Sequence, residues 1–499
     1  MNRRHFCRGS LAAAVAASLS SGQAFSSVLQ ALTQVTSSIN AVTGKGGDVV
    51  LEQAAVQELS DSLRGNLLLT GSEAYDQARR VLNKSIDKYP ALIVQPSGVA
   101  DIQNAVTFAR ERELLVAVKC GGHSFSGKST CDGGMQIDLS HVRGVRVDPE
   151  SRTAYVDGGT HLGDLDHESM AQGLVTTAGT VSHTGVGGLT LGGGFGRVGR
   201  RFGLALDNVK AVDIVTADGQ FRHASAEENP NLYWGVRGGG GNFGVVTSFE
   251  FALHPMHRTI VGGEAVFPIA RLKEVLKFYA EMSANAPDDL YVDCYVFDPP
   301  AADGVAMIHV CYSGPENKAD KVLAPLKKLG EPLNNTIKAM DYVAIQQSFD
   351  NADPRTGGDY MKSGFTSGIS EDLIIALAEY LEPHPERLSW FFFQHSGGAI
   401  GRVDPDATAF AHRYASHALG VIATWNPGAD PAPHFAYVRN YWRELEPHTR
   451  GFYTNEVADE AQTIVNANYQ GNFDRLLKVK DEYDPTNLFR LNANIRRTV

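Results

Sequence analysis

The sequence predicts an α+β protein with two domains, and three observations support this fold class. The chain has 499 residues, more than a single hydrophobic core usually organises. A strand–helix–strand pattern opens the first half and is followed by short strands separated by turn residues. Beyond Pro255 the pattern changes, and helices alternate with longer strands. Hydrophobic residues make up 43% of the chain and charged residues 20%, which is typical of a globular protein.

The N-terminus has the three parts of a twin-arginine export signal, which we place at residues 1–24. Arg3-Arg4 and His5-Phe6 form the charged core, an apolar run follows, and Gly22-Gln23-Ala24 offers a cleavage site. The run is too short to span a bilayer. Because this route exports folded proteins, it predicts a periplasmic or extracellular protein with a tightly held cofactor. The alternative is an alanine-rich helix that merely begins with two arginines.

The next segment, residues 25–57, is rich in Ser, Thr, Gln and Ala and is expected to form a tail or a loose helix. A first domain is expected from residue 58 to residue 257. Its helix at 101–112 is amphipathic, because Ile102, Val106 and Ala109 share one face. Its expected strands lie at 91–94, 116–118, 135–139, 145–148, 153–156, 211–216 and 244–251.

Two glycine-rich segments interrupt this domain. Gly121-Gly122 directly follows an apolar strand, and adjacent glycines let backbone amides approach a diphosphate closely. Taken alone, an ordinary tight turn is the simpler interpretation. The second segment, 185–196, holds seven glycines in twelve residues, a heavy entropic cost unless the backbone wraps a large flat ligand. It lacks the strand–glycine–helix context of a dinucleotide fold.

Together these segments resemble the berberine-bridge-enzyme-like branch of the PCMH-type FAD-linked oxidases, in the vanillyl-alcohol-oxidase superfamily. The resemblance extends from about residue 60 to the end of the chain. It also rests on the stretches Ile137-Asp138-Leu139-Ser140, Gly203 to Val209, Trp234 to Gly244 and Tyr469 to Asn487, the last containing Tyr483-Asp484-Pro485.

The resemblance implies a two-part FAD-binding domain, built from residues 58–257 and completed by residues 455–499. Residues 258–454 would form a substrate domain, an antiparallel sheet backed by helices, with expected strands at 291–297, 306–312 and 388–394. The flavin would lie between the domains. The FAD contacts that the resemblance implies are Cys120, Gly121, Gly122, His123, Ser124, Gly127, Ser182, Gly185, Gly187, Gly188, Leu189, Gly193, Gly194, Gly196, Asp207, Asn208, Gly244, Val246, Asn455 and Asn472.

In this family the histidine after the two glycines bonds to the flavin 8α-methyl carbon, and His123 holds that position. The alternative is a histidine that only hydrogen-bonds a turn. Many relatives add a cysteine tether two residues after a glycine of the next loop. Here that stretch begins at Gly179, and Val181 stands where the cysteine would be. The resemblance therefore implies FAD with one covalent tether and weakens an oligosaccharide-oxidase interpretation.

The family transfers a hydride from a substrate carbon to flavin N5 while a base takes a proton. Members often carry Tyr-x-Asn-Tyr near the C-terminus, and this chain has Tyr453, Asn455 and Glu456 at three of those positions. Glu456 is the candidate base, with Tyr453 as its assistant. The alternative for Glu456 is a surface glutamate at a strand start.

A second candidate base, His395, lies in the expected substrate sheet, with Gln394 and Arg402 nearby. Strand alternation puts Trp390, Phe392 and Gln394 on one face and Phe391, Phe393 and His395 on the other. One face should line the pocket, so His395 is either a catalytic residue or a satisfied sheet histidine.

The net charge of −11 argues against a nucleic-acid or anionic-membrane partner. No Cys-x-x-Cys pair occurs, so no metal site is expected. Among the four cysteines beyond the signal, a bridge between Cys294 and Cys311 on neighbouring strands is a candidate, but the sequence does not decide it.

The function expected is an FAD oxidase that acts on an alcohol or hydroxylated small molecule and is reoxidised by O2. Two alternatives remain open at this point. One is a dehydrogenase that passes electrons to another acceptor, and the other is a flavin-binding protein without a catalytic base.

Overall fold

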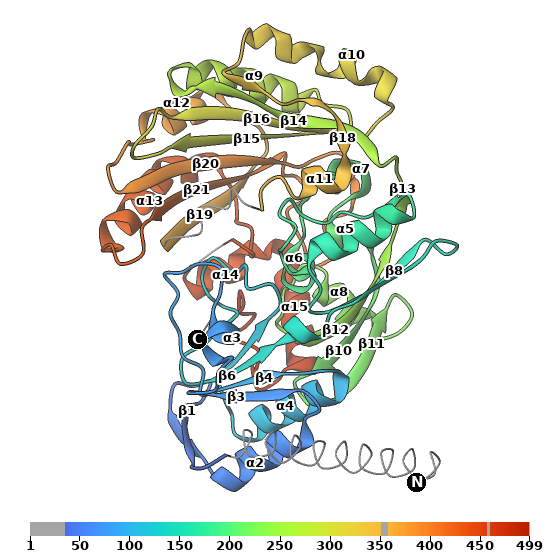
Figure 1. Cartoon of the computed structure of the whole chain (residues 1–499), viewed down its shortest axis with the longest axis vertical. Coiled ribbons are helices and arrows are strands. Elements are labelled where there is room, and N and C mark those ends of the chain that lie inside the picture. Colours follow the sequence, from blue (N-terminus) through green and yellow to red (C-terminus); the bar gives the residue numbers. More distant parts are fainter. Residues whose placement is uncertain (1–34, 351–357, 457–459, 499) are drawn as a thin grey trace, which may run out of the picture.

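The computed structural model describes residues 35–350, 358–456 and 460–498. Figure 1 shows two stacked parts: a lower part containing most of the first half of the chain and its C-terminal helices, and an upper part formed by one large sheet. The segment predicted as an export signal, residues 1–24, lies outside the described residues.

The lower part contains a small sheet in the order β3-β4-β6-β5, where β4 and β5 each pair with β6 in parallel. The predicted strand–helix–strand opening is confirmed as β4, α4 and β5, with the helix buried against the sheet through Ile102, Val106 and Ala109. The elements are β3 (Asn66–Leu69), α3 (Tyr75–Arg79), β4 (Leu92–Gln95), α4 (Val99–Glu111), β5 (Val116–Lys119) and β6 (Met135–Asp138).

A second, antiparallel sheet in the order β11-β10-β12-β8-β7 completes the lower part. The C-terminal helix α15 packs on α8 beside this sheet and shares its core through Leu476 and Val479. This packing explains how the chain's end rejoins its first half. The elements are β7 (Val145–Asp148), β8 (Thr153–Asp157), α5 (Leu162–Ala171), α6 (Val186–Gly192), α7 (Gly199–Phe202), β10 (Val209–Thr216), β11 (Phe221–Ser225), α8 (Pro230–Val236), β12 (Gly244–Ala252), α14 (Gln462–Asn468) and α15 (Phe473–Tyr483).

The upper part is an antiparallel sheet in the order β17-β14-β16-β15-β20-β21-β19, with β18 also paired to β14. Helices α9, α12 and α13 cover its outer face and bury the largest hydrophobic cluster. The elements are β14 (Thr259–Pro268), α9 (Leu272–Ala284), β15 (Leu290–Asp298), β16 (Val305–Tyr312), α10 (Ala319–Leu323), β17 (Asn334–Asn335), β18 (Lys338–Asp341), α11 (Tyr342–Gln346), β19 (Gly358–Thr366), α12 (Glu371–Glu379), β20 (Arg387–His395), β21 (His417–Trp425) and α13 (Ala432–Leu445).

Short elements connect these layers. A two-stranded pairing joins β9 (Leu174–Val175) to β13 (His254–Pro255) just before the upper sheet begins. The short 3-10 helices are η1 (Leu139–His141), η2 (Ala205–Asn208), η3 (Ile269–Arg271), η4 (Glu316–Lys318), η5 (Ala324–Leu329), η6 (Ile400–Arg402), η7 (Glu446–His448) and η8 (Gln470–Asn472).

The prediction of a tail at residues 25–57 is wrong for residues 35–57, the part that the structure describes. Strands β1 (Ile39–Val42) and β2 (Asp48–Leu51) form a hairpin, and α2 (Gln53–Ser62) follows directly. Val42 donates a backbone hydrogen bond to Gly133 and accepts one from Leu115, at 2.7 and 3.0 Å. The polar composition of this segment hides a period-two pattern of apolar residues in the two strands. Its buried members belong to the same hydrophobic cluster as the residues of α4.

All four described cysteines are free. Cys294 and Cys311 do lie on the paired strands β15 and β16, but Cys294 is opposite Ile308 and Cys311 is opposite Tyr291. Their side chains belong to hydrophobic clusters on different faces of the sheet. A bridge between them is therefore excluded by the strand register.

Candidate functional site

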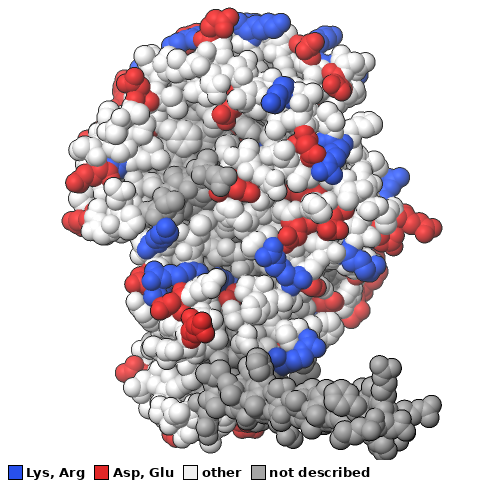
Figure 2. Space-filling model, viewed as in Figure 1, with Lys and Arg blue, Asp and Glu red and all other residues white. Residues whose placement is uncertain are grey.

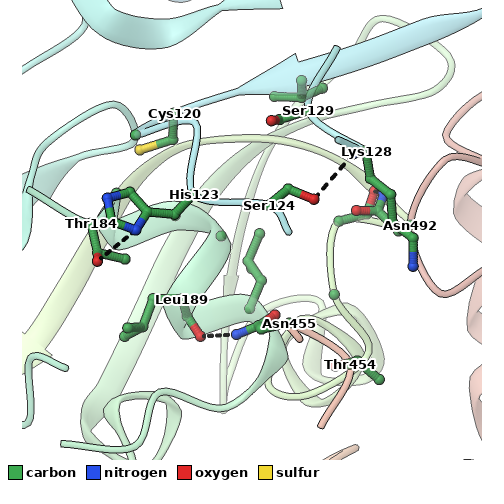
Figure 3. Close-up of a pocket in the computed structure, with 18 of the residues that line it drawn as sticks. Cys120, His123, Ser124, Lys128, Ser129, Thr184, Leu189, Thr454, Asn455 and Asn492 are labelled. Atoms are coloured by element: carbon green, nitrogen blue, oxygen red, sulfur yellow. Dashed lines mark hydrogen bonds between the residues drawn. The ribbon is translucent and has the colours of Figure 1, made fainter. Parts of the chain in front are cut away.

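A cavity of about 330 Å³ lies where the lower sheets, the C-terminal segment and the upper sheet meet. Its walls come from residues within the segments 120–129, 179–191 and 240–246, from 453–456 and from residues within 489–493 near the C-terminus, and from Gln394 of β20. Figure 3 shows labelled side chains of the first glycine segment, of Thr184 and Leu189, and of the C-terminal residues Thr454, Asn455 and Asn492 around one space. A cavity of this size is typical of a small-molecule or cofactor site.

The first glycine segment begins where β5 ends, and it presses against the second. A Cβ at Gly121 would lie 2.3 Å from the backbone nitrogen of Gly185, and one at Gly185 would lie 2.4 Å from Cys120 Sγ. Gly122 has φ +69°, a conformation that favours glycine. Glycine is therefore required here because two backbone segments touch, and that contact forms one edge of the cavity.

His123 follows these glycines and lines the cavity. Its Nε2 lies 2.7 Å from Nδ1 of His183, and its Nδ1 lies 3.2 Å from Oγ1 of Thr184. Figure 3 shows the His123 ring beside Thr184. Both ring nitrogens of His123 thus have defined partners on the opposite loop.

The second glycine segment differs from the expected wrapping loop, because residues 186–192 form the short helix α6. A Cβ at Gly188 would meet nothing within 4 Å, so this glycine leaves the cavity open. Gly187 also lines the cavity, and a Cβ there would lie 2.9 Å from the Gly158 carbonyl oxygen.

Fourteen of the predicted site residues line the cavity. They are Cys120, Gly121, Gly122, His123, Ser124, Gly185, Gly187, Gly188, Leu189, Gly244, Val246, Tyr453, Asn455 and Glu456.

Four of the predicted cofactor glycines do not line the cavity, and each has a packing role instead. A Cβ at Gly127 would lie 2.4 Å from Ile86, one at Gly194 would lie 2.3 Å from Ala205, and one at Gly193 would lie 2.9 Å from Tyr453. A Cβ at Gly196 would lie 2.8 Å from the backbone of Gly179. These glycines permit the chain to fold tightly behind the cavity wall rather than form it.

The predicted contacts Asp207 and Asn208 do not line the cavity either. Asp207 forms an ion pair with Arg413 at 2.7 Å and accepts the N–H of Leu204 at 2.8 Å. Asn208 donates to the Phe202 and Leu204 carbonyls, and its Oδ1 accepts from His254. Their polar atoms hold the chain that follows the second glycine segment in contact with neighbouring parts of the protein.

Ser182 and Asn472 likewise lie behind the wall. Ser182 donates its N–H and its hydroxyl to Asp350, at 2.9 and 2.5 Å. Asn472 donates its side-chain amide to the carbonyls of Pro405 and Thr408, at 2.9 and 3.1 Å.

His395, predicted as a candidate base, faces away from the cavity. The alternation predicted for β20 is confirmed: Phe391 and Phe393 belong to the helix-covered core, and Gln394 lines the cavity. His395 accepts the Val292 N–H on Nδ1 at 3.3 Å, and its Nε2–H donates to Ser283 at 3.1 Å. Burial holds its pKa well below the usual value, so it is a neutral structural histidine.

Arg402, the other basic candidate near this strand, is exposed and pairs with Asp288 at 2.6 Å. It takes no part in the cavity wall.

Glu456 lines the cavity, as do Tyr453 and Gln394. Its Oε2 is enclosed and has no hydrogen-bond partner among the described residues. Burial raises the pKa of this carboxyl to about 8, and the nearby Ser363 hydroxyl offsets the shift only in part. A buried carboxyl with a raised pKa and one oxygen without a partner, on a cavity wall, is typical of a group that exchanges protons.

Tyr453 holds the segment around Glu456 in place and does not itself carry a charge. Its oxygen accepts the Gly194 N–H and the Asn455 side-chain amide, each at 2.8 Å. Burial raises its pKa far above the usual value, so the phenol remains neutral. Asn455 also donates to the Leu189 carbonyl at 3.0 Å, which fixes the C-terminal segment onto α6, as Figure 3 shows.

Aromatic side chains form the surface that the upper sheet turns toward the first glycine segment. Trp390 and Phe392 form a buried cluster with Met361 and Ile422. Further hydrophobic residues pack against this cluster, namely Phe125 from the glycine segment, Tyr295, Phe297 and Leu388. The predicted aromatic face of β20 is thus in contact with the segment that carries His123.

Sequence reasoning missed several cavity residues. Lys128 and Ser129 directly follow the first glycine segment, and their position after it was the available signal. Thr184 lies between the stretch that lacks the cysteine and the second glycine segment, and it carries no pattern of its own. The others include the apolar strand residues Val116, Val118 and Val245, which no pattern separates from ordinary core, and Leu139, Tyr469, Phe489 and Asn492 outside the strands.

The cavity fits the expected FAD in two respects. Gly188 leaves open space where any side chain would project. The hydroxyl of Ser129 is buried on the wall and has no hydrogen-bond partner among the described residues, as expected for a group that hydrogen-bonds a ligand. Ser124, Ser129 and the backbone of the first glycine segment would hold the cofactor's polar part, and His123 would lie at its ring.

Other kinds of site find little support in the described residues. They contain no cluster of three or more His, Cys, Asp or Glu side chains that could hold a metal ion. None of the described helices is long and apolar enough to cross a membrane. Figure 2 shows acidic and basic side chains scattered together over the visible face.

Two family models match the chain. An FAD binding domain matches residues 90–225, and the berberine and berberine-like family matches residues 452–496. An FAD-linked oxidoreductase of Dictyostelium discoideum is 33% identical over 445 residues, covering 88% of this chain and 96% of that protein.

Solved structures agree with these matches. The 6-hydroxy-D-nicotine oxidase of Arthrobacter nicotinovorans has a TM-score of 0.79 and 25% identity, covering 87% of this chain and 98% of that one. A glucooligosaccharide oxidase of Acremonium strictum, described with a 6-S-cysteinyl, 8α-N1-histidyl FAD, has a TM-score of 0.79 and 24% identity, covering 88% and 98%. The α+β fold class with a PCMH-type FAD-binding domain is thereby confirmed. The chain belongs to the berberine-bridge-enzyme-like family of FAD-linked oxidoreductases, and it is an enzyme of that class.

Proposed function

We propose that this enzyme is an oxidase that removes a hydride from a small organic substrate, an alcohol or hydroxylated metabolite, and is reoxidised by O2. Bound FAD supplies the hydride acceptor for this chemistry. The observation that carries the proposal is the enclosed Glu456 carboxyl on the cavity wall, whose Oε2 has no hydrogen-bond partner among the described residues. It offers a proton acceptor within the same cavity as His123.

In this proposal the FAD is held by one covalent bond, to His123. Val181 stands where doubly tethered relatives carry a cysteine. The structure does place one thiol in the cavity wall, that of Cys120. Burial raises the pKa of Cys120 to about 11, so it stays a thiol and is a poor nucleophile for a second bond.

Glu456 acts as the base in its carboxylate form, which predominates only above the raised pKa of about 8. Tyr453 and Asn455 hold the segment that carries it against α6. Gln394 lies on the same cavity wall and offers an amide for orienting the substrate hydroxyl. Phe125 lines the cavity and packs against the buried cluster of Trp390 and Phe392, which favours an apolar or aromatic substrate body.

The experiment that tests this function is an anaerobic screen of alcohols, sugars and phenols, in which bleaching of the flavin absorbance reports hydride transfer. Oxygen is then admitted, and hydrogen peroxide is measured. Bleaching followed by peroxide release is expected. Bleaching that O2 reverses only slowly would instead indicate a dehydrogenase, and a flavin that no compound reduces would contradict catalysis.

We further propose export by the twin-arginine route to the periplasm or beyond. The support is the motif in residues 1–24, which begins with Arg3-Arg4. Replacing both arginines by lysine should leave the protein in the cytoplasm of a bacterial host, as measured by fractionation. Unchanged export of that variant would contradict this route.

A further inference from the structure

Two histidines from different loops meet at the cavity wall where the proposed tether begins. His123 Nε2 and His183 Nδ1 are 2.7 Å apart, and the ring centroids are 4.7 Å apart. At this separation one ring donates its N–H and the other accepts it on a lone pair. The second nitrogen of His123, Nδ1, lies 3.2 Å from Thr184 Oγ1.

The loop that carries His183 is held from several sides. The Leu162 N–H donates to the Thr184 carbonyl at 2.9 Å, and the Gly163 N–H donates to the Ser182 carbonyl at 2.7 Å. The hydroxyl of Ser182 donates to Asp350 at 2.5 Å. Together with the close contact of Gly121 and Gly185, these bonds make the pairing of the two rings a fixed feature of the fold.

We propose that His183 is a positioning residue for formation of the covalent bond between His123 and FAD, and that it accepts the proton that His123 must release. The inference rests on the tether proposed above and extends it to a second residue. A hydrogen bond from His123 Nε2–H to His183 Nδ1 selects the tautomer in which His123 Nδ1 carries the lone pair. That nitrogen is then the atom that forms the bond.

The bond that forms joins His123 Nδ1 to the 8α-methyl carbon, and the bonds that break are one C–H of that methyl group and Nε2–H of His123. One proton leaves the methyl group to solvent, and the Nε2 proton passes to His183. The two electrons of the broken C–H bond reduce the ring, and O2 removes them to give hydrogen peroxide.

The test follows covalent incorporation directly and does not depend on turnover. Full-length protein is produced in riboflavin-starved cells and then incubated with FAD in air. The covalent fraction is measured over time by acid precipitation and peptide mass spectrometry. The variants are His183→Ala, His183→Gln and a control, His167→Gln, whose side chain is 71% exposed on α5.

The wild type and His167→Gln should become fully covalent at the same rate. Both His183 variants should bind FAD reversibly with little change in affinity, which shows that they fold. Their covalent bond should form about 100-fold more slowly or worse, the usual contribution of a positioned proton acceptor. Added imidazole should restore the rate in His183→Ala but not in His183→Gln, where the amide fills the space.

Several results would overturn the inference, and they are distinguishable. A wild-type rate in His183→Ala removes His183 from the step, and a wild-type rate in His183→Gln reduces its role to orientation without proton transfer. FAD found on a His183 peptide in His123→Ala would make His183 a nucleophile instead. A wild-type protein whose FAD is wholly released by acid would overturn the proposed tether itself.

Discussion

The cofactor side of the cavity is built from backbone, whereas the substrate side is built from side chains on strands. On the cofactor side, Gly121 and Gly185 touch so closely that neither has room for a Cβ. On the substrate side, β20 contributes Gln394 to the cavity and Trp390 and Phe392 to the adjoining aromatic cluster, while its alternate residues fill the core. A backbone wall fixes one ligand shape, while a strand wall can change its side chains without changing the fold. We therefore expect cofactor binding to be sensitive to any added atom and substrate choice to be adjustable.

The largest effect is expected where the two sides meet, at Glu456. Replacement of Glu456 by Gln should slow flavin reduction by a factor of about 100 to 10,000 while leaving FAD content unchanged, because only the proton acceptor is lost. Stopped-flow absorbance under nitrogen measures this rate. A variant that reduces as fast as the wild type would show that the base lies elsewhere.

The same carboxyl predicts a pH dependence. Because burial raises the pKa of Glu456 to about 8, the carboxylate that accepts a proton is scarce below that pH. The rate of flavin reduction should therefore rise with pH through about 8 and then level off. In Glu456→Gln this rise should be absent, and a rise that persists would assign the titration to another group.

Two glycine substitutions sharpen the comparison on the cofactor side. Gly121→Ala places a methyl group against the Gly185 backbone and should cost about 3 kcal/mol of folding stability together with loss of FAD. Gly188→Ala projects into open space, so its stability should be unchanged or higher by up to about 1 kcal/mol, while FAD binding weakens. Urea denaturation and flavin absorbance measure the two quantities. Equal stability of the two variants would contradict a wall made by backbone contact.

Neighbouring residues of β20 offer the matching test on the substrate side. Gln394→Ala should alter KM or kcat with little loss of stability, because this side chain lines the cavity. His395→Gln should cost about 1–3 kcal/mol by disturbing buried hydrogen bonds to Val292 and Ser283, with turnover nearly unchanged. The reverse pattern would mean that the sheet turns its other face to the substrate.

The smallest effect is expected at Tyr453. In Tyr453→Phe the Gly194 N–H and the Asn455 amide lose a shared acceptor, which should cost about 1–2 kcal/mol. Flavin reduction should fall only several-fold, because the ring still packs against Phe195. Thermal unfolding and stopped-flow rates check both parts. A loss of rate as large as that of Glu456→Gln would make Tyr453 the proton acceptor.

What the sequence could predict follows the same division. The glycine segments, His123 and the strand alternation of β20 were predictable because backbone contact and period-two alternation leave local signals. Local patterns do not show which face of β20 meets the cavity, so His395 remained a candidate. Local patterns also do not distinguish polar side chains that line the cavity from polar side chains that stabilise its wall from behind. Asp207 is of the second kind, and its partner Arg413 is 206 residues away in sequence. The pairing of His123 with His183 likewise depends on two loops meeting in space.

Peptide mass spectrometry of the acid-precipitated wild-type protein tests the central claim, that His123 holds FAD in the glycine-lined cavity, most directly. The account predicts that a peptide containing His123 carries the mass of FAD, and that peptides containing Cys120 or His183 do not. An unmodified His123 peptide, with all the flavin released into the acid supernatant, would contradict it.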